Sequence, residues 1–167
     1  MWKTEKKKRR LEDKMRTLLL TTMIPVILIM AVLLFIFWQY TKRYSELSYN
    51  LAVSSEFNLS FKDDIDEQIY YVAIGSKGSE TLPYHLVQEA VDTVERLEKT
   101  TNRKGSIKSI YNLKSYLSNL EEYMNRLTET EKYDDRISLL ENYIYMCTSL
   151  IVEEMQNYIY EESMNLV

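Results

Sequence analysis

The residues that could do chemistry in this chain are few, and the densest group of them is acidic. Asp63, Asp64, Asp66 and Glu67 surround Ile65 in the run DDIDE. Hard cations such as Ca²⁺ need several converging oxygens, usually from a loop with a glycine at its sharp turn. No such glycine follows this run. The pattern therefore favours a solvated acidic helix face over a cation site.

Catalytic and metal-binding sets are missing from the sequence. The chain has one histidine, His85, and one cysteine, Cys147. These two residues supply neither a Ser/His/Asp triad nor a Cys/His metal spacing, and the acid–base residues do not cluster. We expect no enzyme activity, metal or cofactor for this chain. His85 is either a pH sensor or an exposed polar residue, and Cys147 is either a buried apolar residue or an intermolecular pairing partner.

Tyrosine is the most abundant residue that could bind a ligand, with 14 in the chain. A tyrosine offers a large apolar body and a polar tip, which suits a ligand pocket between helices. The candidate ligand-binding residues are Tyr70, Tyr116, Tyr143 and Tyr158. The alternative is that these rings flank an apolar core and keep their hydroxyls in water. Both interpretations stay open from the sequence alone.

A long apolar stretch must position everything that follows it. No charged residue occurs between Arg16 and Lys42, so residues 17–41 form 25 uncharged positions. As a helix they would rise about 37 Å, against about 30 Å of bilayer hydrocarbon. A secretory signal has a shorter apolar core that ends at small residues, whereas Trp38 and Tyr40 suit a membrane interface. We expect an uncleaved transmembrane helix, in which Pro25 is tolerated.

Charge predicts how this helix is oriented. Residues 1–16 form a basic tail that holds eight Lys and Arg, and only Lys42 and Arg43 follow the span directly. This bias predicts that the N-terminus is cytoplasmic and that residues 44–167 are extracytoplasmic, on a single-pass protein of the plasma membrane. The run at residues 6–10 also resembles a nucleic-acid patch, but beside a span we interpret it as a topology signal with some attraction to lipid headgroups.

The remainder of the chain is acidic and has the length of one domain. Residues 44–167 carry 11 Lys and Arg against 22 Asp and Glu. Binding to nucleic acid is disfavoured because phosphate recognition needs a basic surface. We treat residues 42–167 as one extracytoplasmic domain.

Residues that break helices are rare, which predicts an all-α domain. The only glycines are Gly75, Gly78 and Gly105, and Pro83 is the only proline outside the span. A sheet protein would need many more turn residues. The expected helices run from the span to about residue 74, from 83 to about 99, from 106 to about 130, and from 134 or 135 onward. Ser106 and either Asp134 or Asp135 are the expected caps of the last two.

Apolar residues recur at helical spacing in each of these segments, most regularly in the third, whose 3, 4, 3, 4, 3 spacing is a heptad seam. These positions are Leu47, Leu51, Phe61, Ile65, Ile69 and Val72; Val87, Ala90, Val91, Val94 and Leu97; Ile110, Leu113, Leu117, Leu120, Met124 and Leu127; and Ile137, Leu140, Ile144, Cys147, Ile151, Met155 and Tyr158. They predict an up-down four-helix bundle outside the membrane. No stop signal closes the last helix, so we expect it to continue into a second transmembrane helix beyond residue 167.

This layout resembles the N-terminal sensory region of bacterial two-component sensor histidine kinases of the YesM type, and chemoreceptors share the plan. The resemblance covers the whole chain and is one of layout. It lies in residues 14–20 (KMRTLLL) with the span after them, and in residues 144–151 and 158–160 of the last helix. The family's phospho-accepting histidine and glycine-rich ATP lid have no counterpart here.

The resemblance implies a sensory input module, with the kinase elsewhere in the parent protein. Such modules dimerise, bind a small molecule or protein outside the cell, and relay that event by helix displacement. The alternative is a single-pass structural or interaction protein that presents a helical bundle to a partner.

Overall fold

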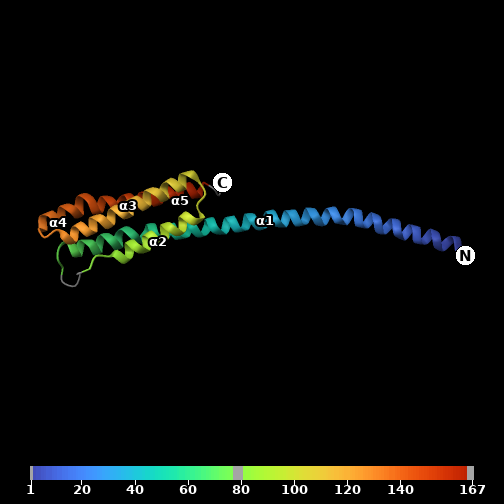
Figure 1. Ribbon diagram of the computed structural model, residues 1–167, viewed down its shortest axis with the longest axis horizontal. Helices are drawn as coiled ribbons and strands as arrows, with labels where there is room; N and C mark the ends of the chain where they lie inside the picture. Colours follow the sequence, from blue (N-terminus) through green and yellow to red (C-terminus); the bar gives the residue numbers. More distant parts are fainter. Residues whose placement is uncertain (1, 77–80, 165–167) are drawn as a thin grey trace. The chain divides into compact units, whose positions relative to one another are not determined.

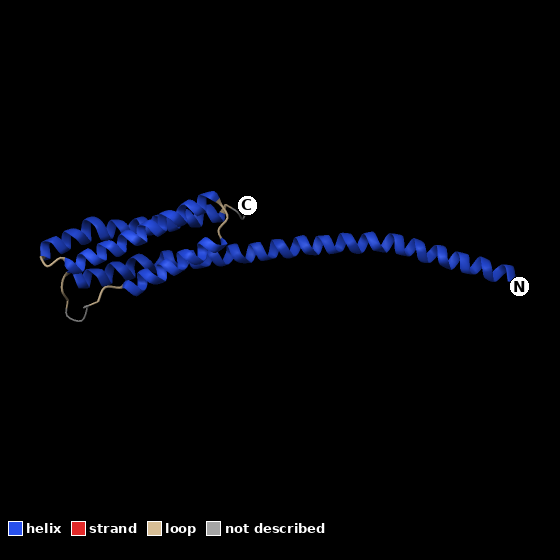
Figure 2. Cartoon of the chain, viewed as in Figure 1, coloured by secondary structure: helices blue, strands red, loops and turns tan. Residues whose placement is uncertain are grey.

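The computed structural model describes the backbone of residues 2–76 and 81–164, and side chains from residue 14 onward within these ranges. Helices and no strands form in these ranges (Figure 2). The chain divides into two compact units, Met1–Ser45 and Glu46–Val167. The side chains of residues 1–13, Gly78 and the expected continuation of the last helix lie outside the described residues. The elements are α1 (Trp2–Ala73), α2 (Tyr84–Thr100), α3 (Lys104–Glu129), α4 (Tyr133–Leu139), the π-helical turn η1 (Leu140–Ile144) and α5 (Tyr145–Ser163) (Figure 1).

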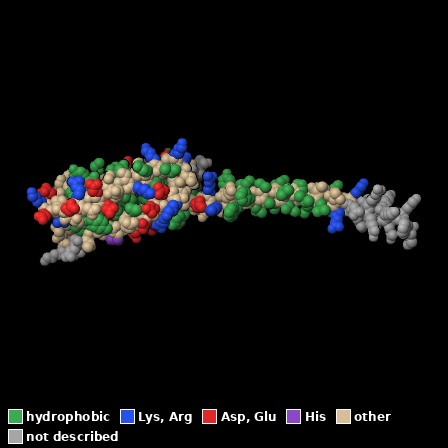
Figure 3. Space-filling view, viewed as in Figure 1, with side chains coloured by type: hydrophobic (Ala, Val, Ile, Leu, Met, Phe, Trp, Pro, Cys, Tyr) green, Lys and Arg blue, Asp and Glu red, His purple; other side chains and the backbone are tan. Residues whose placement is uncertain are grey.

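The first unit contains the apolar stretch of α1. An 18-residue window here has a mean hydropathy of 2.8 and none of it is buried, so by length and composition this part of the helix is able to cross a membrane. Figure 3 shows hydrophobic side chains over its surface. The hydroxyls of Thr22 and Thr41 donate to the carbonyls of Leu18 and Phe37, both at 2.9 Å. Such internal bonds satisfy polar groups where no water is present.

The second unit is a four-helix bundle whose neighbouring helices run antiparallel. Glu98 at the end of α2 pairs with Lys114 in the first half of α3. Arg103, just before α3, donates to the Glu161 carbonyl near the end of α5. Asn50 of α1 bonds to Thr100 at the end of α2, 2.8 Å away. Each bond joins the end of α2 or α5 to an early part of a neighbouring helix within this unit, as an up-down order requires.

The apolar seams predicted from spacing form the core of this unit. All six predicted positions of the third helix are buried in α3, and Leu113 and Leu120 have no exposed surface. From α1, Ile65 and Ile69 are likewise fully buried. The seam of the last helix is buried from Leu140 to Tyr158. The prediction of an all-helical fold is confirmed.

Near the start of the second unit, the buried face of α1 is polar instead of apolar. Leu47 and Leu51 are only half-buried, whereas Asn50 and Ser54 are buried between them. The interior face of α1 here is polar, because Asn50 and Ser54 lie inside it. The Ser54 hydroxyl donates to the Asn50 carbonyl at 2.7 Å, which satisfies it within the helix.

Two expected helix caps are wrong. The helix α3 begins at Lys104, with Arg103 as its N-cap residue, so Ser106 lies inside the first turn. Its hydroxyl is buried and has no partner among the described residues. At α4 the N-cap residue is Lys132, and Asp134 and Asp135 both lie in the first turn. They still place negative charge near the positive end of the helix dipole.

Glycine stops α1 as its position suggested. Gly75 has φ +69°, and its N–H donates to the Val72 carbonyl at 3.1 Å. The Ser76 N–H donates to the Tyr71 carbonyl at 3.0 Å. This pair of bonds is the Schellman motif, in which the left-handed residue is usually glycine because a Cβ is disfavoured there.

Candidate functional site

Three clusters of polar or charged side chains join helices of the second unit. The first, which we call the Asn50–Tyr158 cluster, consists of Asn50, Thr100, Thr101 and Tyr158. The Asn50 amide donates to the Thr100 hydroxyl at 2.8 Å. Tyr158 of α5 has no exposed surface, and its hydroxyl lies 2.9 Å from that of Thr101. The cluster therefore joins α1, the end of α2 and α5.

The direction of the bond between Thr101 and Tyr158 follows from their other partners. The Thr101 hydroxyl donates its only proton to the Leu97 carbonyl, 2.6 Å away. A hydroxyl has one proton to give, so Tyr158 must be the donor to Thr101. Burial raises the pKa of Tyr158 to about 12, although side-chain hydrogen bonding with Thr101 and Asn50 acts in the opposite direction. The phenol is thus held in its neutral form as a hydrogen-bond donor.

The second group, the Lys62–Thr148 cluster, joins α1 to α5 and consists of Lys62, Asp66, Tyr145 and Thr148. Lys62 forms an ion pair with Asp66, one helical turn away. The other oxygen of Asp66 accepts a bond from the buried Thr148 hydroxyl at 2.8 Å. The Lys62 ammonium lies 5.5 Å from the centre of the Tyr145 ring. Burial raises the pKa of Tyr145, and the negative charge of Asp66 adds to this effect.

The third group, the Tyr–Arg cluster, consists of Tyr123, Arg126 and Tyr143. The ring centres of Tyr123 and Tyr143 are 5.4 Å apart and tilted by 53°. The Arg126 guanidinium carbon lies 6.0 Å from the first ring centre and 5.8 Å from the second. These distances are within the range of cation–π attraction. The cluster joins the end of α3 to η1.

The turn η1 explains where Tyr143 sits. The Tyr145 N–H donates to the Leu140 carbonyl, five residues earlier, instead of to the usual fourth residue. A π-helical turn contains one residue more than an α-helical turn, and such turns occur frequently at functional sites. Leu140 and Ile144, at its two ends, both remain buried. The extra residue is accommodated on the outer side, which carries Glu141, Asn142 and Tyr143.

The four predicted ligand-binding tyrosines do not form one site. Tyr158 belongs to the buried Asn50–Tyr158 cluster, and Tyr143, which is 46% exposed, to the Tyr–Arg cluster. Tyr116 is half-buried, and its carbonyl lies 3.1 Å from the Cys147 sulfur. Tyr70 is exposed beside Tyr71, with ring centres 5.8 Å apart. Ligand binding by these residues stays a prediction.

The other candidate residues from the sequence do not form a further site among the described residues. Of the acidic run, Asp66 joins the Lys62–Thr148 cluster and Ile65 is buried in the core. His85 is exposed, and Cys147 is buried. No group of three His, Cys, Asp or Glu able to hold a metal occurs among the residues that were placed. The four proposed membrane-anchor residues, Arg16, Pro25, Trp38 and Tyr40, lie on exposed parts of α1.

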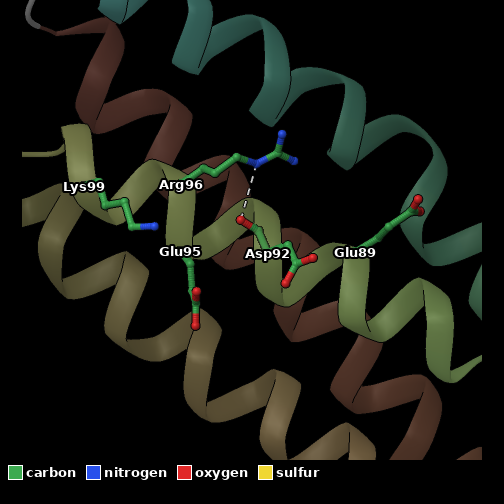
Figure 4. A pocket seen from close by; sticks show the side chains of 5 residues that line it. All are labelled: Glu89, Asp92, Glu95, Arg96 and Lys99. Atoms are coloured by element: carbon green, nitrogen blue, oxygen red, sulfur yellow. Dashed lines mark hydrogen bonds between the residues drawn. The ribbon is translucent and has the colours of Figure 1, made fainter.

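A shallow surface depression on α2 is a less promising site. Five exposed charged residues line it: Glu89, Asp92, Glu95, Arg96 and Lys99 (Figure 4). All come from one helix, and Arg96 bonds to the Asp92 carbonyl and the Thr93 hydroxyl of that helix. Within residues 14–76 and 81–164, no second element contributes a side chain to it. We interpret it as a solvated helix face.

Sequence reasoning missed most members of the three clusters. Asn50 and Thr148 are polar residues at interior helical positions, Thr101 directly follows α2, and Arg126 is an unremarkable surface residue by spacing. The available signal was that Asn50 and Ser54 continue the apolar face of α1 at a spacing of four. Partners such as Thr101 and Tyr158, 57 positions apart, become visible only in the fold.

These features define a helical bundle with polar interhelical clusters, whose first helix includes an apolar stretch long enough to cross a membrane. Comparison with protein-family models, curated proteins and solved structures finds no match to the chain.

Proposed function

We propose that the chain is the membrane-anchored, extracytoplasmic sensory input module of a signal-transduction receptor, of the sensor histidine kinase kind. One observation carries the proposal. The same helix, α1, contains the apolar stretch and contributes Ile65 and Ile69 to the bundle core. A change in how the bundle packs α1 therefore acts on the helix that contains the span.

The polar clusters support displacement of α1 as the relay. Asn50 ties α1 to α2, and Asp66 ties it to Thr148 of α5. Hydrogen bonds between packed helices have discrete partners, so a shift of α1 exchanges one set of bonds for another. Packed interfaces of this kind tend to have two discrete arrangements, which suits a switch. A ligand acts by binding one arrangement more tightly than the other.

The proposal includes a topology, with the basic tail in the cytoplasm, residues 17–41 in the plasma membrane and residues 44–167 outside. It also includes a homodimer, in which two modules act on adjacent spans. The excess of Lys and Arg before the span supports the orientation.

Reporter fusions test the topology. A reporter before Lys3 and another after Val167 are expected to report opposite sides of the membrane. Activity of both reporters on the same side would contradict a single crossing. An N-terminal sequence of the mature protein that starts near residue 40 would show a cleaved signal instead.

The length and architecture of the native protein test the signalling role. Mass spectrometry of the protein purified from its own cells is expected to identify a cytoplasmic output region beyond residue 167. Its absence would contradict the receptor proposal and would favour an anchored bundle that serves only as an interaction surface.

A further inference from the structure

The Tyr–Arg cluster presents a cation whose hydrogen-bonding capacity is unused. A guanidinium carries five N–H donors in a planar fork. Within the described part of the chain, the Arg126 guanidinium forms no hydrogen bond or ion pair, although Glu122 and Glu129 lie about one turn away on α3. The guanidinium lies over the rings of Tyr123 and Tyr143. Contact with ring faces leaves the edges of the fork able to bind an anion.

The two tyrosines make this cation more than an isolated surface charge. They come from different elements, α3 and η1, and their rings are tilted toward each other beside the guanidinium. Tyr123 is half-buried and packs against the core, which limits its motion. Tyr143 stands on the outer side of the π-helical turn. An arginine held by two rings loses less conformational freedom on binding than a free one does.

We propose that the Tyr–Arg cluster is a binding site for a small carboxylate that carries a flat apolar group. The Arg126 fork would donate two parallel hydrogen bonds to the carboxylate oxygens, since planar bidentate pairing is the preferred geometry of arginine with carboxylates. The apolar group would lie against the exposed part of the Tyr143 ring. The role of this site as the sensory site rests on the proposed function, whereas the binding itself does not.

The surroundings predict modest affinity and clear selectivity. The extracytoplasmic part of the chain is acidic, with 22 Asp and Glu against 11 Lys and Arg in residues 44–167, so anions are not attracted in general. Binding then depends on the local fork and rings. An exposed ion pair is weak, so we expect a Kd of order millimolar for a minimal probe, about 4 kcal/mol of binding free energy.

Nuclear magnetic resonance of ring-labelled tyrosine tests the site in the whole chain reconstituted in lipid nanodiscs. Tyr123→Phe and Tyr143→Phe spectra assign the two signals. Benzoate is expected to shift both signals saturably, and benzyl alcohol, the neutral matched probe, is not. N-acetylphenylalanine compared with its amide shows whether the terminal carboxylate of a peptide is accepted as well.

Variants separate recognition from general effects. Arg126→Gln is expected to weaken benzoate binding at least tenfold, and Arg126→Lys by less. Tyr143→Leu should also weaken it, whereas Tyr143→Phe keeps the ring and the binding. Arg96→Gln, an exposed arginine of α2, is the matched control and should leave binding unchanged.

Two outcomes would overturn the site: equal shifts with benzoate and benzyl alcohol, or unchanged binding in Arg126→Gln. Circular dichroism confirms that each variant is folded, which is expected because Arg126 is exposed. Binding that persists in a protein shown to have no output region would leave the site standing and reject the sensory role. If benzoate does not bind to a protein whose receptor topology is confirmed, the site is rejected and the sensory role remains.

Discussion

At the scale of single residues, the Tyr158 hydroxyl shows how a polar group is retained in an apolar seam. Its ring fills a seam position of α5, and its proton is directed to Thr101 because Thr101 has already donated its own proton to Leu97. A buried hydroxyl without a partner costs free energy, so the bond also specifies where the end of α2 must lie.

Replacing Tyr158 by phenylalanine should lower the free energy of unfolding by about 1 kcal/mol, the usual contribution of one buried hydrogen bond. Urea unfolding in mild detergent, followed by near-ultraviolet circular dichroism of the tyrosines, measures this. Tyr160→Phe removes an exposed hydroxyl of the same helix and should be neutral. If the two variants lowered the free energy of unfolding equally, the hydrogen bond from Tyr158 to Thr101 would not be stabilising.

The same substitution should change the alkaline part of the stability profile. The pKa of Tyr158 is raised from 10.0 to about 12 in the fold, so the folded state holds this proton more tightly than the unfolded state does. Its contribution to stability is complete below pH 10 and is lost as the pH rises toward 12. Wild-type protein should therefore lose more stability than Tyr158→Phe across that window.

Cys147 should be chemically inert in the folded protein. Burial raises its pKa to about 11, and the thiolate is the form that reacts. Because it is the only cysteine, alkylation by iodoacetamide reports on it alone. We expect almost no labelling at pH 8 in the native state and rapid labelling in urea. A Cys147→Ala/Ser149→Cys double variant, with its thiol at an exposed position, should label quickly when folded.

At the scale of elements, the starts of α2, α3 and α4 form without side-chain caps. The three N-cap positions of α2, α3 and α4 carry Pro83, Arg103 and Lys132, none of which makes a side-chain capping bond. At the C-terminal end of α1, Arg136 of α4 donates to the Val72 carbonyl at 2.5 Å. This end is thus closed by a neighbouring helix and by Gly75 together.

Gly75→Ala should destabilise the bundle by about 1 kcal/mol or somewhat more, because a Cβ at φ +69° meets the backbone of its own residue. No neighbour among the described residues lies within 4 Å of the added atom, so the expected loss comes from the backbone conformation. Gly75→Asn is the control, since asparagine tolerates this conformation better and should cost less. Urea midpoints of the three proteins provide the measurement.

The turn η1 should tolerate the loss of one residue. Deleting Asn142, which is exposed, converts the π-helical turn to an α-helical one and leaves the seams on both sides in register. We expect a folded bundle in which the Tyr–Arg cluster is disturbed. Deleting Gln156 from α5 instead rotates everything after it by about 100° and should unfold the end of the helix. Melting curves distinguish the two deletions.

At the scale of the whole molecule, the two units bury their apolar residues in different ways. The second unit encloses a core contributed by all its helices, whereas the apolar residues of the first are exposed along α1. An exposed apolar surface of this length is stable only against lipid or another protein. The proposed bilayer partner follows from this exposure.

Residues 46–167 should fold without the first unit. We expect a soluble helical protein with a cooperative thermal transition, because its core needs no residue before Glu46. Size-exclusion chromatography and circular dichroism test this, and the elution volume also tests the proposed dimer. A molten, aggregated product would mean that the first unit contributes to the stability of the bundle.

Local rules were enough to identify the helices, their inward faces and the apolar span. Helical spacing is a property of neighbouring residues, so the six seam positions of α3 could be read directly from their separations. The glycine at position 75 stops α1 for an equally local reason. The caps at Ser106, Asp134 and Asp135 were mispredicted because the N-cap residues Arg103 and Lys132 lie two or three positions earlier, and helix ends depend on the packing around them.

The sequence by itself determined the helical class, the inward faces and the apolar stretch, because each depends on residues within a few turns of one another. Only the tertiary structure decided which polar groups meet. Thr101 with Tyr158, Asp66 with Thr148, and Arg126 with Tyr143 are far apart in the chain, and their pairing depends on how each helix is rotated and offset against its neighbour. That offset is set by the packing of the whole core, which no local pattern contains.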